Sequence, residues 1–219
     1  MLVKRRMSSP VITVAAKTPV MEALDMMRQR SIRRMPVVDQ NGRMIGIVSD
    51  KDLLNAGPSD ATTLSIWELN YLLTQVRVQD VMTQKVLTVT EDTPIEEAAF
   101  VMAENKIGGL PVMRDDNLVG LITETDLFKM FLELMGARTA GVRVTALVPD
   151  KQGELDALTH AIAQAGGNFV SFGQFDGDTP QDRLITFKVS GMSETAVQAA
   201  ITPHINALLD LRTCCTTDS

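Results

Sequence analysis

The chain has 219 residues, of which 45% are hydrophobic and 4% aromatic, with a net charge of −6 and a pI near 5.0. It is long and apolar enough for two compact domains, and its acidic balance argues against a nucleic-acid binder. No apolar run approaches the ~20 residues of a membrane span, and no apolar stretch follows the basic N-terminal residues. We therefore expect a cytoplasmic protein without membrane contact. The adjacent Cys214 and Cys215 are expected to be reduced surface thiols.

The first half of the chain contains two copies of one pattern. Thr18-Pro19 recurs as Thr93-Pro94 at an offset of 75 residues (94 − 19). After Pro36 and Pro111 the offset becomes 74 (126 − 52), because the turn of the second copy is one residue shorter. The matched residues are then Gly46, Ser49 and Asp52 in the first copy and Gly120, Thr123 and Asp126 in the second. Such repetition indicates two related structural units.

Each copy predicts the element order β-α-β-β-α. In the first copy we expect a strand at 11–14, a helix capped by Thr18, a hairpin of strands 36–39 and 44–48, and a helix at 50–54 capped by Ser49. In the second copy we expect a strand at 86–89, a helix at 94–105, a hairpin of 111–113 and 118–122, and a helix capped by Thr123 that ends near 135. Each small sheet leaves one face uncovered, so the two copies should pack on each other.

The segment 61–78 joins the two copies. It is too apolar for a flexible linker, and Ser65 with Glu68 forms a capping-box pattern. We expect an ordered connecting helix that packs on the two copies or on a second subunit. Trp67 and Tyr71 fit an interface, and simple core packing is the equal alternative.

The region 141–213 has a different pattern. It predicts a strand at 143–148, a helix that ends at Gly166-Gly167, strands at 169–175 and 184–189, a helix at 193–205 and a last strand at 208–212. The helical stripe consists of Leu155, Leu158 and Ile162. The element order is therefore β-α-β-β-α-β.

These motifs resemble two known domain families. T-P-x-x-x-A-x-x-x-M, R-x-P-V-V-D and G-I-V-S-x-x-D-L resemble the CBS domain, and two in tandem resemble a Bateman module. The last region resembles an ACT domain in D-K-x-G-x-L and G-G-N, although the loop 150–153 lacks the proline of that family's D-x-P-G. The combination is similar to bacterial CBS-ACT proteins related to the acetoin-utilisation protein AcuB.

The resemblance implies an α/β (α+β) fold with four parts. These are CBS domain 1 at 1–60, a connecting helix at 61–78, CBS domain 2 at 79–136 and a ferredoxin-like βαββαβ ACT domain at 141–213.

The pairs Ser49-x-x-Asp52 and Thr123-x-x-Asp126 are the candidate ligand groups. Each hydroxyl lies at a strand-to-helix junction, where helix amides can bind an anion. The carboxylate one turn later can accept hydrogen bonds from a ribose diol. The alternative is that both pairs are ordinary helix N-caps. Their occurrence in both copies, with the resemblance, favours ligand binding.

The resemblance implies a cleft between the copies at each aspartate, since tandem CBS domains typically bind adenosine compounds there. The Asp126 cleft would contain Leu121, Ile122 and Thr123, faced by Val11, Ile12, Thr13, Arg33, Arg34 and Pro36. The Asp52 cleft would contain Ile47, Val48 and Ser49, faced by Val86, Leu87, Gly108, Gly109 and Pro111. Because guanidiniums bind phosphate in a bidentate way, we expect the Asp126 cleft to be the better phosphate site. Lys51 and Lys106 are secondary candidates, and a solvated arginine pair is the alternative.

The ACT resemblance implies an amino-acid site at Asp150, Gly153 and Asn168. The alternative for Asn168 is turn chemistry beside Gly166-Gly167.

The favoured function is a non-catalytic regulatory protein. AMP, ADP or ATP is the expected regulatory ligand, an amino acid is the candidate for the ACT domain, and the protein partner is unknown. An enzyme is disfavoured because His160 and His204 form no His-x-x-x-His motif and no Cys-x-x-Cys or P-loop is present; we expect no metal and no catalytic cofactor. A constitutive scaffold with degenerate clefts is the other alternative. The apolar residues Leu127, Phe128, Met130, Phe131 and Leu134 predict a homodimer.

Overall fold

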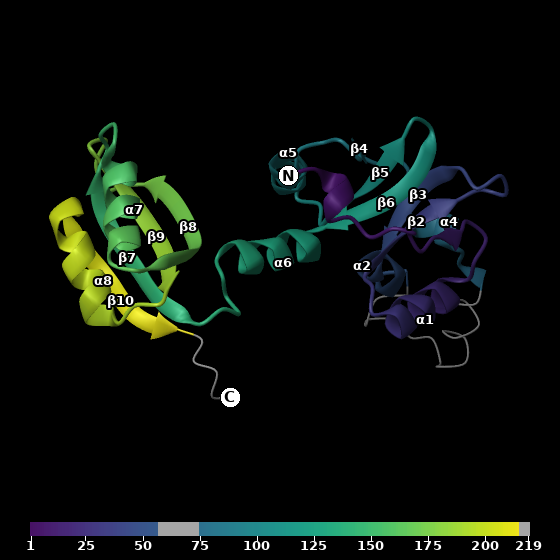
Figure 1. Cartoon of the computed structure of the whole chain (residues 1–219). Helices are drawn as coiled ribbons and strands as arrows, with labels where there is room; N and C mark the ends of the chain where they lie inside the picture. The colour runs from purple at the N-terminus through teal and green to yellow at the C-terminus, as the bar shows by residue number, and fades with distance from the viewer. Residues whose placement is uncertain (57–74, 215–219) are drawn as a thin grey trace. The chain divides into compact units, whose positions relative to one another are not determined.

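The computed structural model describes residues 1–56 and 75–214 (Figure 1). The chain divides into two compact units, Met1–Leu127 and Phe128–Ser219. Most of the predicted connecting helix, including Trp67 and Tyr71, lies outside the described residues, as does Cys215.

The first unit contains two copies of a three-stranded sheet with two helices, which confirms the predicted element order. The first copy consists of β1 (Val14–Ala15), α1 (Val20–Arg30), β2 (Arg34–Val38), β3 (Met44–Ser49) and α2 (Asp50–Leu54). The second consists of β4 (Val89–Thr90), α5 (Ile95–Asn105), β5 (Gly109–Arg114), β6 (Asn117–Thr123) and α6 (Glu124–Leu134), a helix that continues past Leu127 into the second unit. In each copy the first two strands are parallel and the last two form an antiparallel hairpin.

Two details differ from the predictions. The first strand of each copy is shorter and lies later in the chain than expected, because β1 pairs with β2 at only two residues and β4 does the same with β5. The helices α1 and α5 begin after Pro19 and Pro94, which hold the N-cap positions in extended conformation without a side-chain cap. Thr18 is therefore not the cap of α1.

The segments that precede the two copies are exchanged between them. The amide of Val78, at the start of α4 (Val78–Val81), donates to the carbonyl of Thr18 at 3.0 Å. The amide of Val3, at the start of the 3-10 turn Val3–Arg5, donates in the same way to the carbonyl of Thr93 at 3.0 Å. Both valines are fully buried. Each copy is thus completed by the segment that leads into the other copy, so neither is an independent domain.

The cores of the two copies use equivalent positions. The repeat offset relates the buried pairs Val14 and Val89, Val20 and Ile95, Ala23 and Ala98, Met27 and Met102, Met35 and Leu110, Val37 and Val112, and Val48 and Ile122. Aliphatic and methionine side chains fill both cores, as the low aromatic content suggests. The repeated hydrophobic pattern therefore reflects repeated packing.

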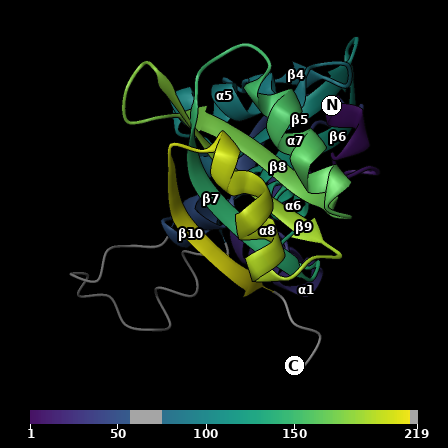
Figure 2. The same ribbon diagram turned by 60° about the vertical axis from the view of Figure 1, so that its left-hand side comes forward.

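The second unit is a four-stranded antiparallel sheet with two helices on one face (Figures 1 and 2). Its elements are β7 (Gly141–Pro149), α7 (Glu154–Gln164), β8 (Asn168–Asp176), β9 (Asp182–Ser190), α8 (Glu194–Ile201), a 3-10 turn (Thr202–His204) and β10 (Ala207–Cys214). The strand order β10-β7-β9-β8 gives the predicted ferredoxin-like βαββαβ arrangement. The predicted helix 193–205 ends earlier, at Ile201, where Thr202–His204 form the 3-10 turn that contains Pro203.

The core of this unit lies between the sheet and its helices. It includes Val144, Ile162, Ile185 and Phe187, all almost fully buried. Within the described ranges 1–56 and 75–214, no helix is long and apolar enough to cross a membrane.

Candidate functional site

The two Ser/Thr-x-x-Asp pairs form the same hydrogen-bonded structure. Oδ2 of Asp52 accepts from the amide of Ser49 at 2.8 Å and from its Oγ at 2.6 Å, while the amide of Asp52 donates back to Oγ at 3.2 Å. At Thr123 and Asp126 the corresponding distances are 2.9, 2.7 and 3.4 Å. Both pairs are thus helix N-caps of the capping-box type. Oδ1 of each aspartate takes no part in these hydrogen bonds. Capping and ligand binding can use different oxygens of the same carboxylate.

A cavity of about 430 Å³ opens beside Asp52 and is called the Asp52 cavity below. This volume lies within the ~300–1,000 Å³ usual for small-molecule sites. It is lined by Arg34, Ile47, Val48, Ser49, Asp52, Thr83, Lys85, Val86, Leu87, Asn105, Lys106, Ile107, Gly108 and Gly109. These residues come from both copies and from the segment that leads into the second.

The structure brings together most of the residues expected at the Asp52 cleft. The exception is Pro111, which is buried within β5 and does not line the cavity. The equivalent Pro36 is likewise buried, within β2. The expectations from sequence did not include Thr83, Lys85, Asn105 or Ile107. Lys85 directly precedes the predicted strand at 86–89, and this position could have identified it as a residue of the cavity. Lys106, a secondary candidate, lines the cavity, whereas Lys51 does not.

Arg34 lies at a different site from the one predicted. It was expected opposite Asp126, but it lines the Asp52 cavity. The reason is the absence of side chains at Gly108 and Gly109: a Cβ on Gly108 would overlap with the Arg34 guanidinium. Arg33 takes another direction, and its Nη2 donates to Oγ1 of Thr125 at 3.4 Å. The two arginines therefore point to different places, and only Arg34 lines the Asp52 cavity.

The other residues expected opposite Asp126 are not gathered around it in a described cavity. Val11 and Thr13 line a separate cavity of about 430 Å³ that also includes Arg114 and does not include Thr123 or Asp126. Ile12 packs against the core of the first copy. On strand β6, Leu121 and Ile122 are buried. Because the lining of the Asp52 cavity includes a complete Ser/Thr-x-x-Asp pair, this cavity is the better candidate for a ligand site among the described residues.

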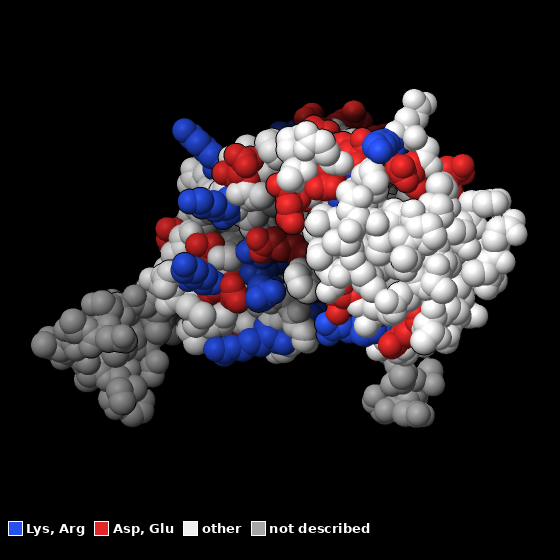
Figure 3. Space-filling view, turned by 90° about the vertical axis from the view of Figure 1, so that its left-hand side faces the viewer, with Lys and Arg blue, Asp and Glu red and all other residues white. Residues whose placement is uncertain are grey.

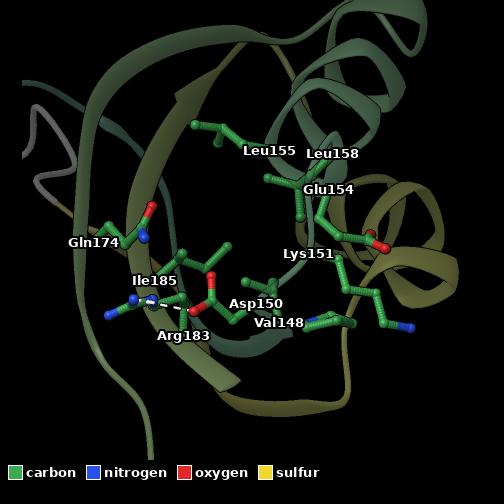
Figure 4. Close-up of a pocket in the computed structure, with 10 residues that line it drawn as sticks. Val148, Asp150, Lys151, Glu154, Leu155, Leu158, Gln174, Arg183 and Ile185 are labelled. Atoms are coloured by element: carbon green, nitrogen blue, oxygen red, sulfur yellow. Dashed lines mark ion pairs between the residues drawn. The ribbon is translucent and has the colours of Figure 1, made fainter. Parts of the chain in front are cut away.

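The second unit has a smaller cavity, of about 80 Å³, beside Asp150 (Figure 4). Oδ2 of Asp150 forms an ion pair with Arg183 at 3.0 Å, and Arg183 also contacts Asp176 at 2.5 Å. The hydrogen bond from Arg183 to Asp150 raises the pKa of the guanidinium above its ordinary value. Leu155, Leu158 and Ile185 provide an apolar wall, and Lys151 and Glu154 add charges of both signs. This cavity therefore combines an ion pair with an apolar surface.

The predicted residues of the second unit lie at two ends of its sheet. Gly153 directly precedes α7 with a φ of +90°, near Asp150. Asn168 pairs with Ser190, whereas Pro149, next to Asp150, pairs with Asp182 at the other end of β9. The length of β9 separates them by on the order of 25 Å. A single copy of this unit therefore does not bring Asn168 to the Asp150 cavity.

Within residues 1–56 and 75–214, no three histidine, cysteine, aspartate or glutamate side chains are placed to hold a metal ion.

Comparisons with known proteins agree with the repeated structure. The CBS domain family matches residues 3–59 and 78–133. A CBS domain-containing protein of Dictyostelium discoideum is 33% identical over 135 residues, which are 61% of this chain and 93% of the relative. The L-aspartate semialdehyde sulfurtransferase of Methanocaldococcus jannaschii is 30% identical over 131 residues, 59% of this chain and 23% of that enzyme.

Two solved structures are similar to a part of the chain. The CBS domain pair of protein MJ0100, in complex with 5′-methylthioadenosine and S-adenosyl-L-methionine, is 30% identical with a TM-score of 0.50, and the match covers 60% of this chain and 95% of that one. A putative acetoin utilization protein (AcuB) from Vibrio cholerae is 31% identical with a TM-score of 0.52, covering 62% and 93%. With both repeats matched, and with their exchanged segments included, the chain belongs to the CBS-domain family.

Proposed function

We propose that this protein is a non-catalytic regulatory sensor that binds an adenosine compound in the Asp52 cavity. The observation that carries the proposal is the position of the Ser49–Asp52 cap, whose carboxylate lines a cavity built from both repeats. The similar CBS pair of protein MJ0100 holds two adenosine compounds, which supports this ligand class.

The cavity offers separate groups for the parts of such a ligand. Oδ1 of Asp52 can accept hydrogen bonds from the ribose hydroxyls, because the capping box uses Oδ2. Val86, Leu87 and Ile107 offer apolar surface for the adenine base. Bonds of this kind bind and orient a ligand and cause no chemical step, so occupancy itself would be the signal.

Isothermal titration calorimetry with adenosine, AMP, ATP and S-adenosylmethionine tests the proposal. At least one compound should bind, and it should also raise the melting temperature because it binds the folded state. If none binds at millimolar concentration, the adenosine-sensor proposal fails and the scaffold alternative is favoured. Turnover of a bound compound would contradict the non-catalytic proposal.

An amino acid is the second candidate ligand, at the Asp150 cavity of an ACT-like second unit. The specific observation is that the cavity holds the ion pair of Asp150 and Arg183: on opening, Asp150 could bind an ammonium group and Arg183 a carboxylate (Figure 4). The small volume would admit only the polar part of the ligand. Titration with the common amino acids, with Asp150→Asn as the comparison, tests this proposal.

We propose that the protein forms a homodimer, which transmits the ligand signal together with a protein partner in the cytoplasm. The support comes from α6, which has no buried residue. Phe128, Phe131 and Leu134 on this helix are 65%, 49% and 59% exposed, although large apolar side chains favour burial. In the view of Figure 3, acidic and basic side chains are interspersed.

Phe131→Glu should weaken this dimer by ~10-fold or more, because aromatic anchors dominate most interfaces. Analytical ultracentrifugation across the micromolar range measures the effect. Lys129→Glu is the control, since Lys129 is exposed on the same helix and is also replaced by glutamate. Its charge change is larger than that of Phe131→Glu, so a smaller effect on the dimer would exclude a purely electrostatic cause. A monomeric wild-type protein at these concentrations, or equal effects of both variants, would contradict the assignment of α6 to the interface.

A further inference from the structure

The two repeats differ at one pair of equivalent positions near the ligand cavity. Arg33-Arg34 in the first repeat corresponds to Gly108-Gly109 in the second, at the offset of 75 residues (109 − 34). We propose that Arg34 makes the Asp52 cavity selective for adenosine compounds that carry phosphate, against uncharged and sulfonium-bearing ones. This inference rests on the proposed function and adds the charge class of the ligand and the residue that selects it.

The position of Arg34 is set by both repeats. Its backbone pairs with Ser49 across the β2–β3 hairpin, next to the hydroxyl of the cap. Its guanidinium occupies the space above Gly108, where a side chain would overlap with it, and its Cδ lies 3.4 Å from the Cβ position of Gly109. Glycine at both positions therefore allows an arginine of the first repeat to reach the cavity wall formed by the second.

The guanidinium is available to a ligand. Among residues 1–56 and 75–214, no side chain forms a hydrogen bond or ion pair with it, and the carboxylate beside it is that of Glu124, whose Oε2 lies 2.5 Å from the same Cβ position of Gly108 that Nη2 of Arg34 overlaps. Arg33 differs, because it already donates to Thr125. An arginine that lines a cavity and forms no ion pair with the described residues can donate two parallel hydrogen bonds to one phosphate.

The charges of the lining point to an anionic ligand. Arg34, Lys85 and Lys106 line the cavity, Asp52 is the single carboxylate among the lining residues that the structure describes, and the carboxylate of Glu124 lies beside Gly108 at its wall, so the cations outnumber the carboxylates. If Asp52 holds the ribose, the group attached at the 5′ carbon determines which charge meets these cations. A nucleotide places phosphate there, whereas S-adenosylmethionine places a positive sulfonium and 5′-methylthioadenosine an uncharged thioether. Coulomb attraction therefore favours the nucleotide and disfavours the sulfonium.

Calorimetric titration of adenosine, AMP and S-adenosylmethionine with the full chain and two variants tests the inference. Arg34→Gly gives the first repeat the residue of its counterpart, and Arg33→Gly is the matched control. AMP should bind the wild type ~10-fold or more tightly than adenosine, and Arg34→Gly should remove ~10-fold or more of this preference, as expected for a charged hydrogen bond. Adenosine affinity should change less than ~2-fold, and Arg33→Gly should behave as the wild type.

Higher salt should reduce the AMP preference of the wild type and leave that of Arg34→Gly nearly unchanged. Arg34→Gln, which retains most of the side chain, serves as a second variant and should lose the same preference if the glycine variant folds poorly. An unchanged ratio of AMP to adenosine affinity in both Arg34 variants, or equal wild-type affinities for AMP and S-adenosylmethionine, would overturn the inference while leaving the adenosine site intact. Failure of every adenosine compound to bind would instead overturn the proposed function.

Discussion

Replacing Val3 by aspartate should destabilise the first unit by on the order of 3–5 kcal/mol, the usual cost of an uncompensated buried charge. Val3 is fully buried, and its amide is bonded to Thr93 in the second repeat. The variant therefore places a carboxylate in the core that the N-terminal segment completes. Val78→Asp should have a similar effect on the first repeat, because Val78 occupies the equivalent position there.

Urea denaturation followed by circular dichroism measures this loss. Arg5→Asp is the control, because Arg5 belongs to the same 3-10 turn but is exposed. We expect this control to change stability by less than ~0.5 kcal/mol, as surface substitutions usually do. If Val3→Asp and Arg5→Asp unfold at the same urea concentration, the exchanged segments do not stabilise the repeats.

The sequence alone could predict both three-stranded sheets, because their signals are local. Short continuous apolar runs mark β2, β3, β5 and β6, and the Asn41-Gly42 turn with its positive φ at Gly42 joins the first hairpin. The exchanged segments could not be predicted in this way. Val3 contacts a residue 90 positions away (93 − 3). The local spacing of hydrophobic residues contains no information about a contact between residues so far apart in the sequence.

The direction of the Arg34 side chain could not be predicted from the sequence, for a related reason. The resemblance placed its backbone near one cleft, but the guanidinium lies where Gly108 leaves space, in the other repeat.

The position of Asn168 relative to Asp150, in contrast, could have been derived from the sequence. In a β-α-β unit the two strands run parallel. The loop after the first strand and the start of the second strand therefore lie at opposite ends of the sheet. Strands β7 and β8 both pair antiparallel with β9 and show this geometry.

Asp52→Ala should weaken binding of an adenosine nucleotide by ~10- to 100-fold, because it removes a charged acceptor of hydrogen bonds from the cavity. The prediction is specific to this aspartate, since Asp52 lines the Asp52 cavity and Asp126 lies outside it. The cleft favoured by the structure is therefore the opposite of the one favoured by the position of the arginines in the sequence.

Asp126→Ala is a closely matched control for this experiment. Asp52 and Asp126 both accept hydrogen bonds from the amide and hydroxyl of a capping residue, so both variants lose the same capping box. The stability cost should be similar in the two variants, about 1 kcal/mol for a lost cap. Calorimetry should then show a large loss of affinity in Asp52→Ala and little change in Asp126→Ala. The reverse ranking would place the ligand at the second cap, and equal small effects would mean that these carboxylates serve the helices alone.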